Sequence, residues 1–291
     1  MRPAAFVSAA IVTWATWAAW ATWAACAAPA VLVLAGCGNE QPKSALGYTE
    51  DAKRAYDSAM DTFNAHDWLE AQTEMREVKR KYSYSKWARQ AELRIADADV
   101  EQEKFADAIR EYKDFIHAHR SDMEDVIYAR SRIVDSTYAE IPESFLMPAS
   151  EERDQAAVID AYKELKSFLE EYPDAKQAGH MRELLGNVTG RLVRHELYVA
   201  RFYLKKDNYD AAVARIQYAL KNYGDADAAN VTSADGSLRA QALLLLGTTF
   251  LKMNRWQDAR QAFEAVVRGY GQSPLATEAR NYIRFLETKG V

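Results

Sequence analysis

One pattern of large and small residues recurs five times along the chain and constrains the fold more than any other feature. Large, small and further apolar or aromatic residues stand at offsets 0, 3, 7, 10 and 14. The alternating steps of three and four place each set on one face of an α-helix. The pattern predicts five amphipathic helices, each with an alanine at a close helix crossing. The copies are Trp68/Ala71/Met75/Val78/Tyr82, Phe105/Ala108/Tyr112/Phe115/His119, Val158/Ala161/Leu165/Phe168/Tyr172, Tyr209/Ala212/Ile216/Ala219/Tyr223 and Trp256/Ala259/Phe263/Val266/Tyr270.

A second helix is expected before each of these five, because small residues also recur upstream. Nine positions before the large residue stand Ala59, Ala96, Ala200 and Gly247. Paired helices with small residues at their crossing resemble the tetratricopeptide repeat, whose unit is about 34 residues. This resemblance implies an all-α fold, an α-α superhelix of about five helix pairs plus a C-terminal capping helix. A generic helical bundle is the alternative. The expected helices are 51–64/68–81, 86–102/105–119, 123–139/152–171, 176–205/209–222, 238–253/256–269 and 274–287.

The N-terminal segment has the features of a targeting signal. Residues 3–36 contain no charged side chain, and such a run is long enough to span a bilayer. It ends in Leu34-Ala35-Gly36-Cys37, which resembles the lipobox of bacterial lipoproteins. The resemblance implies a signal peptide at 1–36, a diacylglycerol and an N-acyl chain on Cys37, and a lipidated polar tether at 37–50. The alternative is a plain transmembrane anchor in which Cys37 is a bystander.

The sequence offers no convincing catalytic or metal site. Its formal net charge is −5, without the basic excess that a nucleic-acid surface requires. The five histidines are scattered, and His195-Glu196 lacks the second histidine of a zinc-protease helix four residues after the first. We therefore expect no enzyme activity, no metal and no nucleic-acid partner.

The mature chain resembles the BamD family, lipoproteins of the outer-membrane β-barrel assembly machinery. The resemblance is most specific in HELYVARFYLKKDNYDAAVARIQYALKNYG (195–224) and extends to AVIDAYKELKSFLEEYPDA (157–175). It implies a non-enzymatic scaffold, anchored in the outer membrane by lipid and facing the periplasm. N-terminal repeats (51–140) would receive C-terminal segments of unfolded β-barrel proteins. After an insertion loop (141–153), C-terminal repeats (154–291) would dock on the barrel-forming subunit with periplasmic repeat domains. Other assembly lipoproteins would be further partners.

Candidate site residues follow from this resemblance. His195, Glu196, Tyr209 and Arg215 fall on the family's motif positions and are candidate partner contacts. The alternative for Arg215 is a surface arginine that supports the long helix.

Aromatic residues near the N-terminus are the candidates for substrate contact. Tyr48, Tyr56 and Trp87 are candidates to line a groove for an extended client segment, where rings would add contacts to backbone hydrogen bonds. A role in the core or between repeats is the alternative for each. A second function of another kind stays open, in which a tetratricopeptide lipoprotein scaffolds pilus, secretion or other cell-envelope machinery.

Overall fold

Helices account for nearly all of the regular structure. The computed structural model describes residues 45–142, 148–224, 232–233 and 236–290, all within one compact unit, Ser44–Val291. In this part of the chain two short strands, β1 (Thr232–Ser233) and β2 (Gly236–Ser237), pair antiparallel. The helices are α1 (Ala45–Asn64), α2 (Trp68–Lys81), α3 (Lys86–Glu101), α4 (Phe105–Ala118), α5 (Met123–Ala139), α6 (Ala156–Glu171), α7 (Ala178–Leu204), α8 (Tyr209–Asn222), α9 (Leu238–Lys252), α10 (Trp256–Gly269) and α11 (Pro274–Thr288).

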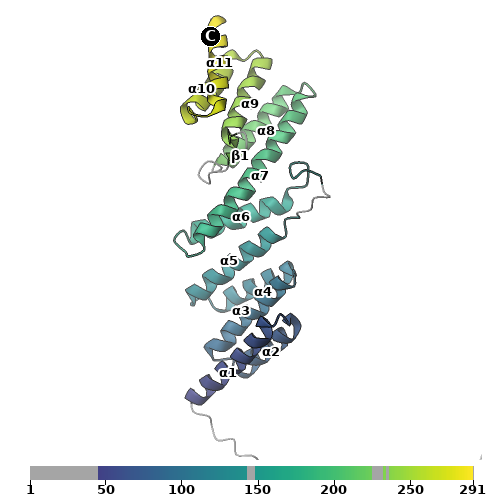
Figure 1. Ribbon diagram of the computed structural model, residues 1–291, viewed down its shortest axis with the longest axis vertical. Helices are drawn as coiled ribbons and strands as arrows, with labels where there is room; N and C mark the ends of the chain where they lie inside the picture. The colour runs from purple at the N-terminus through teal and green to yellow at the C-terminus, as the bar shows by residue number, and fades with distance from the viewer. Residues whose placement is uncertain (1–44, 143–147, 225–231, 234–235, 291) are drawn as a thin grey trace, which may run out of the picture. The chain divides into compact units, whose positions relative to one another are not determined.

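Successive helices pack against one another in chain order. Each helix lies mainly against the helix before it and the helix after it, and contacts with more distant helices are few (Figure 1). This neighbour-to-neighbour packing is typical of a repeat array, whereas a generic bundle would surround a shared centre. The predicted all-α fold is confirmed, with five helix pairs followed by α11.

The repeated alanines lie at the helix crossings, as their spacing predicts. Ala71, Ala108, Ala161, Ala212 and Ala259 are all completely buried. Residues at offsets 7 and 10 are buried in every copy, while the large first residue is only partly buried in four of the five. Small side chains at the crossings let the helix backbones approach closely.

Four of the five pairs share one type of turn. A residue with left-handed backbone stands two positions before the large anchor, at His66, Glu103, Asp207 and Asn254, with φ between 55 and 64°. After it, a backbone N–H donates to a carbonyl five residues earlier, as Lys104 does to Asp99 over 2.8 Å. This bonding satisfies carbonyls that would otherwise be free at the end of the first helix. The third pair is joined instead through residues 140–155, which contain the predicted insertion loop 141–153.

Two helix starts differ from the predicted bounds. α1 begins at Ala45, so residues 45–50 of the predicted polar tether are helical. Packing against α2 explains this, because the rings of Tyr48 and Tyr82 lie edge to face 5.4 Å apart. α6 begins at Ala156, four residues later than expected. Here the buried Gln155 amide donates to the carbonyls of Ser150 and Arg153, each over 2.8 Å, which holds the preceding segment in an irregular conformation.

The buried apolar residues form three clusters. One continuous cluster extends from Val134 in α5 to Leu286 in α11. Two smaller clusters occupy the N-terminal helices, one around Met75 in α1–α3 and one around Tyr112 in α3–α5. The change from small clusters to a continuous one lies close to the predicted insertion loop, although the assignment of a role to each half stays a prediction.

The predicted signal peptide and lipidation site lie outside the described residues. Among the helices that the structure does describe, none combines the length and the apolar character needed to cross a membrane.

Candidate functional site

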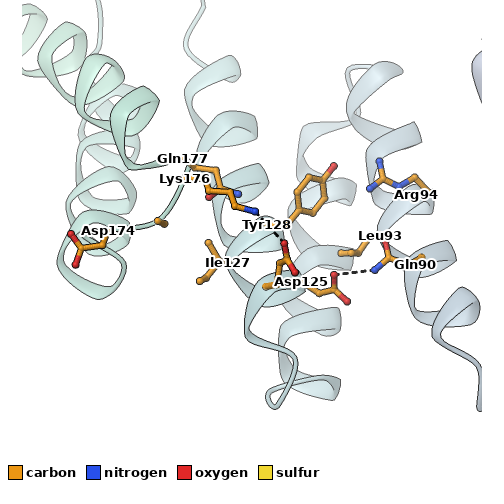
Figure 2. A pocket seen from close by; sticks show the side chains of 11 residues that line it. Gln90, Leu93, Arg94, Asp125, Ile127, Tyr128, Asp174, Lys176 and Gln177 are labelled. Atoms are coloured by element: carbon orange, nitrogen blue, oxygen red, sulfur yellow. Dashed lines mark hydrogen bonds and ion pairs between the residues drawn. The ribbon is translucent and has the colours of Figure 1, made fainter.

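A pocket of about 580 Å³ opens between the first helices of two neighbouring pairs. Its walls come from α3, α5 and the connection between α6 and α7 (Figure 2). Leu93, Ile127 and Ala175 give it apolar surface, and Leu93 is almost fully buried. A cavity of this volume is within the usual range for a bound ligand or an anchoring side chain.

Charged and polar side chains surround this apolar surface. Gln90 of α3 donates to Asp125 of α5 over 2.9 Å, which ties the two walls together. Lys176 and Glu124 form an ion pair of 3.4 Å at the rim, and both side chains are about nine-tenths exposed. In Figure 2, the α5 residues lie between Gln90 and Leu93 on one side and Lys176 and Gln177 on the other. The arrangement suits an extended peptide with apolar side chains and polar backbone groups.

A buried carboxylate behind the pocket positions two of its walls. Asp97, only 3% exposed, accepts hydrogen bonds from the hydroxyls of Tyr112 and Tyr128. It also pairs with Arg94 over 2.6 Å and with Arg132 over 3.4 Å. Because Arg94 and Tyr128 line the pocket, the carboxylate fixes side chains from both α3 and α5.

The two tyrosines of this cluster remain protonated over a wide pH range. Burial, followed by the negative charge of Asp97, raises the pKa of Tyr128 to about 12. The same two causes raise the pKa of Tyr112 above its ordinary value. Their hydroxyls therefore act as hydrogen-bond donors to the carboxylate and not as acids.

The aromatic residues predicted to line a substrate groove pack between helices. Tyr56 of α1 and Trp87 of α3 lie with ring centroids 5.2 Å apart, and Tyr48 contacts Tyr82. All three are partly buried against the α1–α3 cluster. None of the three lines the pocket described above, which lies one helix pair further along. Their contact with a client stays a prediction.

Two of the predicted partner contacts meet in the C-terminal half. The guanidinium of Arg215 on α8 lies 3.4 Å from the carboxylate of Glu196 on α7. The Glu196 side chain is 9% exposed and the Arg215 side chain 45% exposed, so the arginine presents the pair to solvent. The pair joins α7 to α8 and leaves the guanidinium partly exposed, and partner binding by Arg215 stays a prediction.

The other two predicted contacts lie apart from this pair. His195 turns toward the insertion, and its Nδ1 lies 2.7 Å from the carbonyl oxygen of Glu151. The Tyr209 hydroxyl donates to Asp207 over 2.8 Å at the turn before α8. This bond to a carboxylate raises the pKa of Tyr209. These contacts give both residues local structural roles, and partner binding by either stays a prediction.

Sequence reasoning missed the residues of the pocket and of the buried cluster. Residues 93–99 of α3 are nearly all buried, including Asp97 and Asp99. Buried acidic residues require partners. Two aspartates within a largely apolar helical stretch were the one signal in the sequence that pointed to the buried cluster. Asp99 finds its partner in Gln72, whose amide donates to it over 2.7 Å. In the part of the chain that the structure describes, no three His, Cys, Asp or Glu side chains are grouped to hold a metal ion.

Family models match most of the described chain. The model of the YfiO family, described as an outer membrane lipoprotein, matches residues 49–234. A tetratricopeptide-repeat model matches residues 200–274 and 244–283. The first match includes both the pocket and the Glu196–Arg215 pair.

Relatives of known name agree with this match. The outer membrane protein assembly factor BamD of Caulobacter vibrioides is 28% identical over 200 residues, which are 67% of this chain and 62% of that protein. The factor of the same name from Neisseria meningitidis serogroup A is 22% identical over 254 residues, 85% of this chain and 91% of that protein. The chain thus spans about three-fifths of the Caulobacter relative.

A solved tetratricopeptide protein from Thermus thermophilus is more distant. It is 13% identical, with a TM-score of 0.33, over 80% of this chain and 98% of that one. The family assignment therefore rests on the match of the family model and on the helical fold described above. The chain belongs to the YfiO family of outer membrane lipoproteins, the family of BamD.

Proposed function

We propose that this protein is a non-enzymatic scaffold lipoprotein of the machinery that assembles β-barrel proteins into the outer membrane. The observation that carries the proposal is the family match over residues 49–234, since relatives in that family are named outer membrane protein assembly factors. Acyl chains on Cys37 would hold the chain to the periplasmic leaflet. Two or more acyl chains are sufficient for stable anchoring.

Each half has a proposed role. The pocket between α3 and α5 takes apolar side chains from the C-terminal segment of an unfolded barrel protein. The face around Arg215 docks on the barrel-forming subunit, where an exposed guanidinium suits a carboxylate on the partner. A scaffold needs no reacting group for either task.

Affinity purification of the full chain, tagged at its C-terminus, from detergent-solubilised membranes tests the function. We expect recovery of a β-barrel subunit with periplasmic repeat domains, together with other assembly lipoproteins. Recovery of a secretin or a pilus component in its place would contradict the proposal and favour a scaffold for other envelope machinery.

Arg215→Glu in the same experiment tests the docking face. The substitution places a second carboxylate beside Glu196 and removes the exposed cation, so recovery of the barrel subunit should fall at least about tenfold, or 1.4 kcal/mol. Arg110→Glu is the matched control, because Arg110 also pairs with an acidic neighbour, Asp107 at 2.9 Å, but lies on α4. Circular dichroism should show unchanged helicity in both variants. Equal recovery from the two would remove Arg215 from the docking surface.

Ala175→Trp tests the pocket. A tryptophan at this lining position should fill the apolar volume and weaken binding of a synthetic peptide by about tenfold. The peptide alternates apolar and polar residues, as a transmembrane β-strand does. Ala118→Trp is the control, because Ala118 lines a different pocket, of about 380 Å³, between α2, α3 and α4. Fluorescence anisotropy of the labelled peptide measures both. Similar affinities for the two variants would show that the peptide binds elsewhere.

A further inference from the structure

One edge of the first helix pair carries apolar and cationic side chains that point into solvent. Leu46, in the first turn of α1, is 77% exposed, and Tyr84, in the turn between α2 and α3, is 97% exposed. Lys81 and Lys86 end α2 and begin α3 on either side of that turn, and both are exposed. These four residues are called the edge patch. Among the described residues, little covers the two large apolar side chains of this patch.

Within the described residues, the two lysines of the edge patch have no acidic partner. Neighbouring cations are engaged, since Lys79 pairs with Glu92 at 3.5 Å and Arg80 pairs with Glu77 at 3.0 Å. By contrast, no carboxylate of the described residues pairs with Lys81 or Lys86.

The lysines contact aromatic rings instead. Their ammonium groups lie 5.4 Å from the ring centre of Tyr82 and 4.7 Å from that of Trp87, respectively. Such contacts leave most of each ammonium open to solvent. The chain as a whole is acidic, with a net charge of −5, so this edge is a local exception.

The edge patch lies beside the start of α1, which is close in the sequence to the proposed lipid anchor at Cys37. α1 and α2 are joined by a short turn, and Tyr48 near the start of α1 contacts Tyr82 at the end of α2. The beginning of α1 therefore lies at the same edge as the turn that bears Tyr84. Eight peptide steps separate Ala45 from Cys37, and an extended chain of this length spans at most about 29 Å. An acylated Cys37 would thus keep this edge near the bilayer.

We propose that the edge patch rests on the anionic headgroup surface of the membrane to which the chain is anchored. Tyr84 and Leu46 enter the interfacial layer, where tyrosine is favoured, and Lys81 and Lys86 bind lipid phosphates. This inference rests on the lipidation in the proposed function and adds an orientation to it. A flexible tether alone leaves the helices free to rotate, whereas a second contact fixes the angle at which the array leaves the membrane.

Lipid quenching of a fluorophore on the full processed lipoprotein tests the contact. Cys37 would be the one cysteine of the mature chain, and its thiol would be acylated, so an introduced cysteine takes the label cleanly. Ser83→Cys places the label at the edge patch. Leu69→Cys places it at the opposite end of α2, where Leu69 is 68% exposed. The protein is reconstituted into phosphatidylethanolamine vesicles with phosphatidylglycerol and a spin-labelled quencher lipid. We expect strong quenching at position 83, little at position 69, and loss of the difference at high salt.

Substitution of the two lysines tests whether their charge, and not only the short tether, holds the edge patch at the membrane. Each lysine near an anionic surface contributes about a fivefold change in the ratio of docked to undocked protein. Lys81→Gln with Lys86→Gln should therefore largely abolish quenching at position 83. The control is Lys205→Gln with Lys206→Gln, which also removes two exposed lysines, one of them 5.9 Å from the ring centre of Phe202. Equal quenching at positions 83 and 69, or no loss with the Lys81/Lys86 pair, would overturn the proposal.

A mass measurement distinguishes this inference from the function on which it rests. An acylated mature chain that recovers its barrel partner but shows equal quenching refutes the edge patch and leaves the proposed function intact. A chain with unmodified Cys37 refutes the lipid anchor and the edge-patch proposal together.

Discussion

Asp97→Ala is expected to lower the free energy of unfolding by about 3–5 kcal/mol. The substitution removes the acceptor shared by Tyr112 and Tyr128 and the counter-charge of Arg94 and Arg132. The Tyr112 and Tyr128 hydroxyls and the Arg94 guanidinium, about three-quarters buried, would then lose their acceptor, while Arg132 would keep only Asp135, at 3.9 Å, as an acidic partner among the described residues. Unpartnered buried charges are costly, and the same change loosens two walls of the pocket.

Urea unfolding followed by circular dichroism measures this loss. Asp57→Ala is the matched control, because the Asp57–Lys53 pair is about half exposed and such pairs contribute no more than about 1 kcal/mol. A similar small effect for both variants would mean that water or rearranged side chains replace the Asp97 carboxylate, and the cluster would lose its assigned role.

Gly247→Ala should destabilise the fifth helix pair by about 1–2 kcal/mol. A Cβ at this position would lie 2.5 Å from Cε1 of Phe263, closer than carbon atoms can approach. Phe263 has little freedom to move, because it is fully buried and its ring stacks on Tyr282 with centroids 4.7 Å apart. The resulting strain outweighs the gain of about 1 kcal/mol that alanine brings to a helix.

Gly179→Ala is the matched control, because alanine should not lower the stability at this position. Gly179 lies in the first turn of α7, and a Cβ there would meet no atom within 4 Å. We expect this variant to be neutral or about 0.5 kcal/mol more stable than the parent chain. Thermal unfolding of the two variants compares them directly, and a stabilised Gly247→Ala variant would contradict the close helix crossing.

The repeat was predictable because it depends on local spacing. A position such as Ala212 is specified by its distance along the chain from Tyr209 and Ile216, and the same offsets recur in every copy. Most helix bounds followed to within a residue or two. The starts of α1 and α6 did not follow, because one depends on the Tyr48–Tyr82 contact and the other on hydrogen bonds of Gln155. Both are tertiary contacts that helical periodicity does not encode.

The site was less predictable for a similar reason. Gln90 and Asp125 meet at the pocket although they lie 35 residues apart in the sequence. The partners of Asp97 come from three helices. Family resemblance marked His195 and Arg215, yet only the structure shows that the histidine turns to the insertion while the arginine pairs with Glu196. The left-handed turn residues were not predicted from the sequence, because none of the four is a glycine, the residue that adopts this conformation most readily.

The unequal division of the apolar core has a consequence for motion. In a stacked array the stability is approximately a sum of terms between adjacent units. The N-terminal pairs, held by two small clusters, can therefore open at a lower free-energy cost than the pairs that share the continuous cluster from Val134 to Leu286. Transient opening is therefore expected mainly in α1–α4, whereas the Glu196–Arg215 pair lies among helices of the continuous cluster. The pocket lies where the two regions meet, because its Ile127 and Ala175 pack against the continuous cluster.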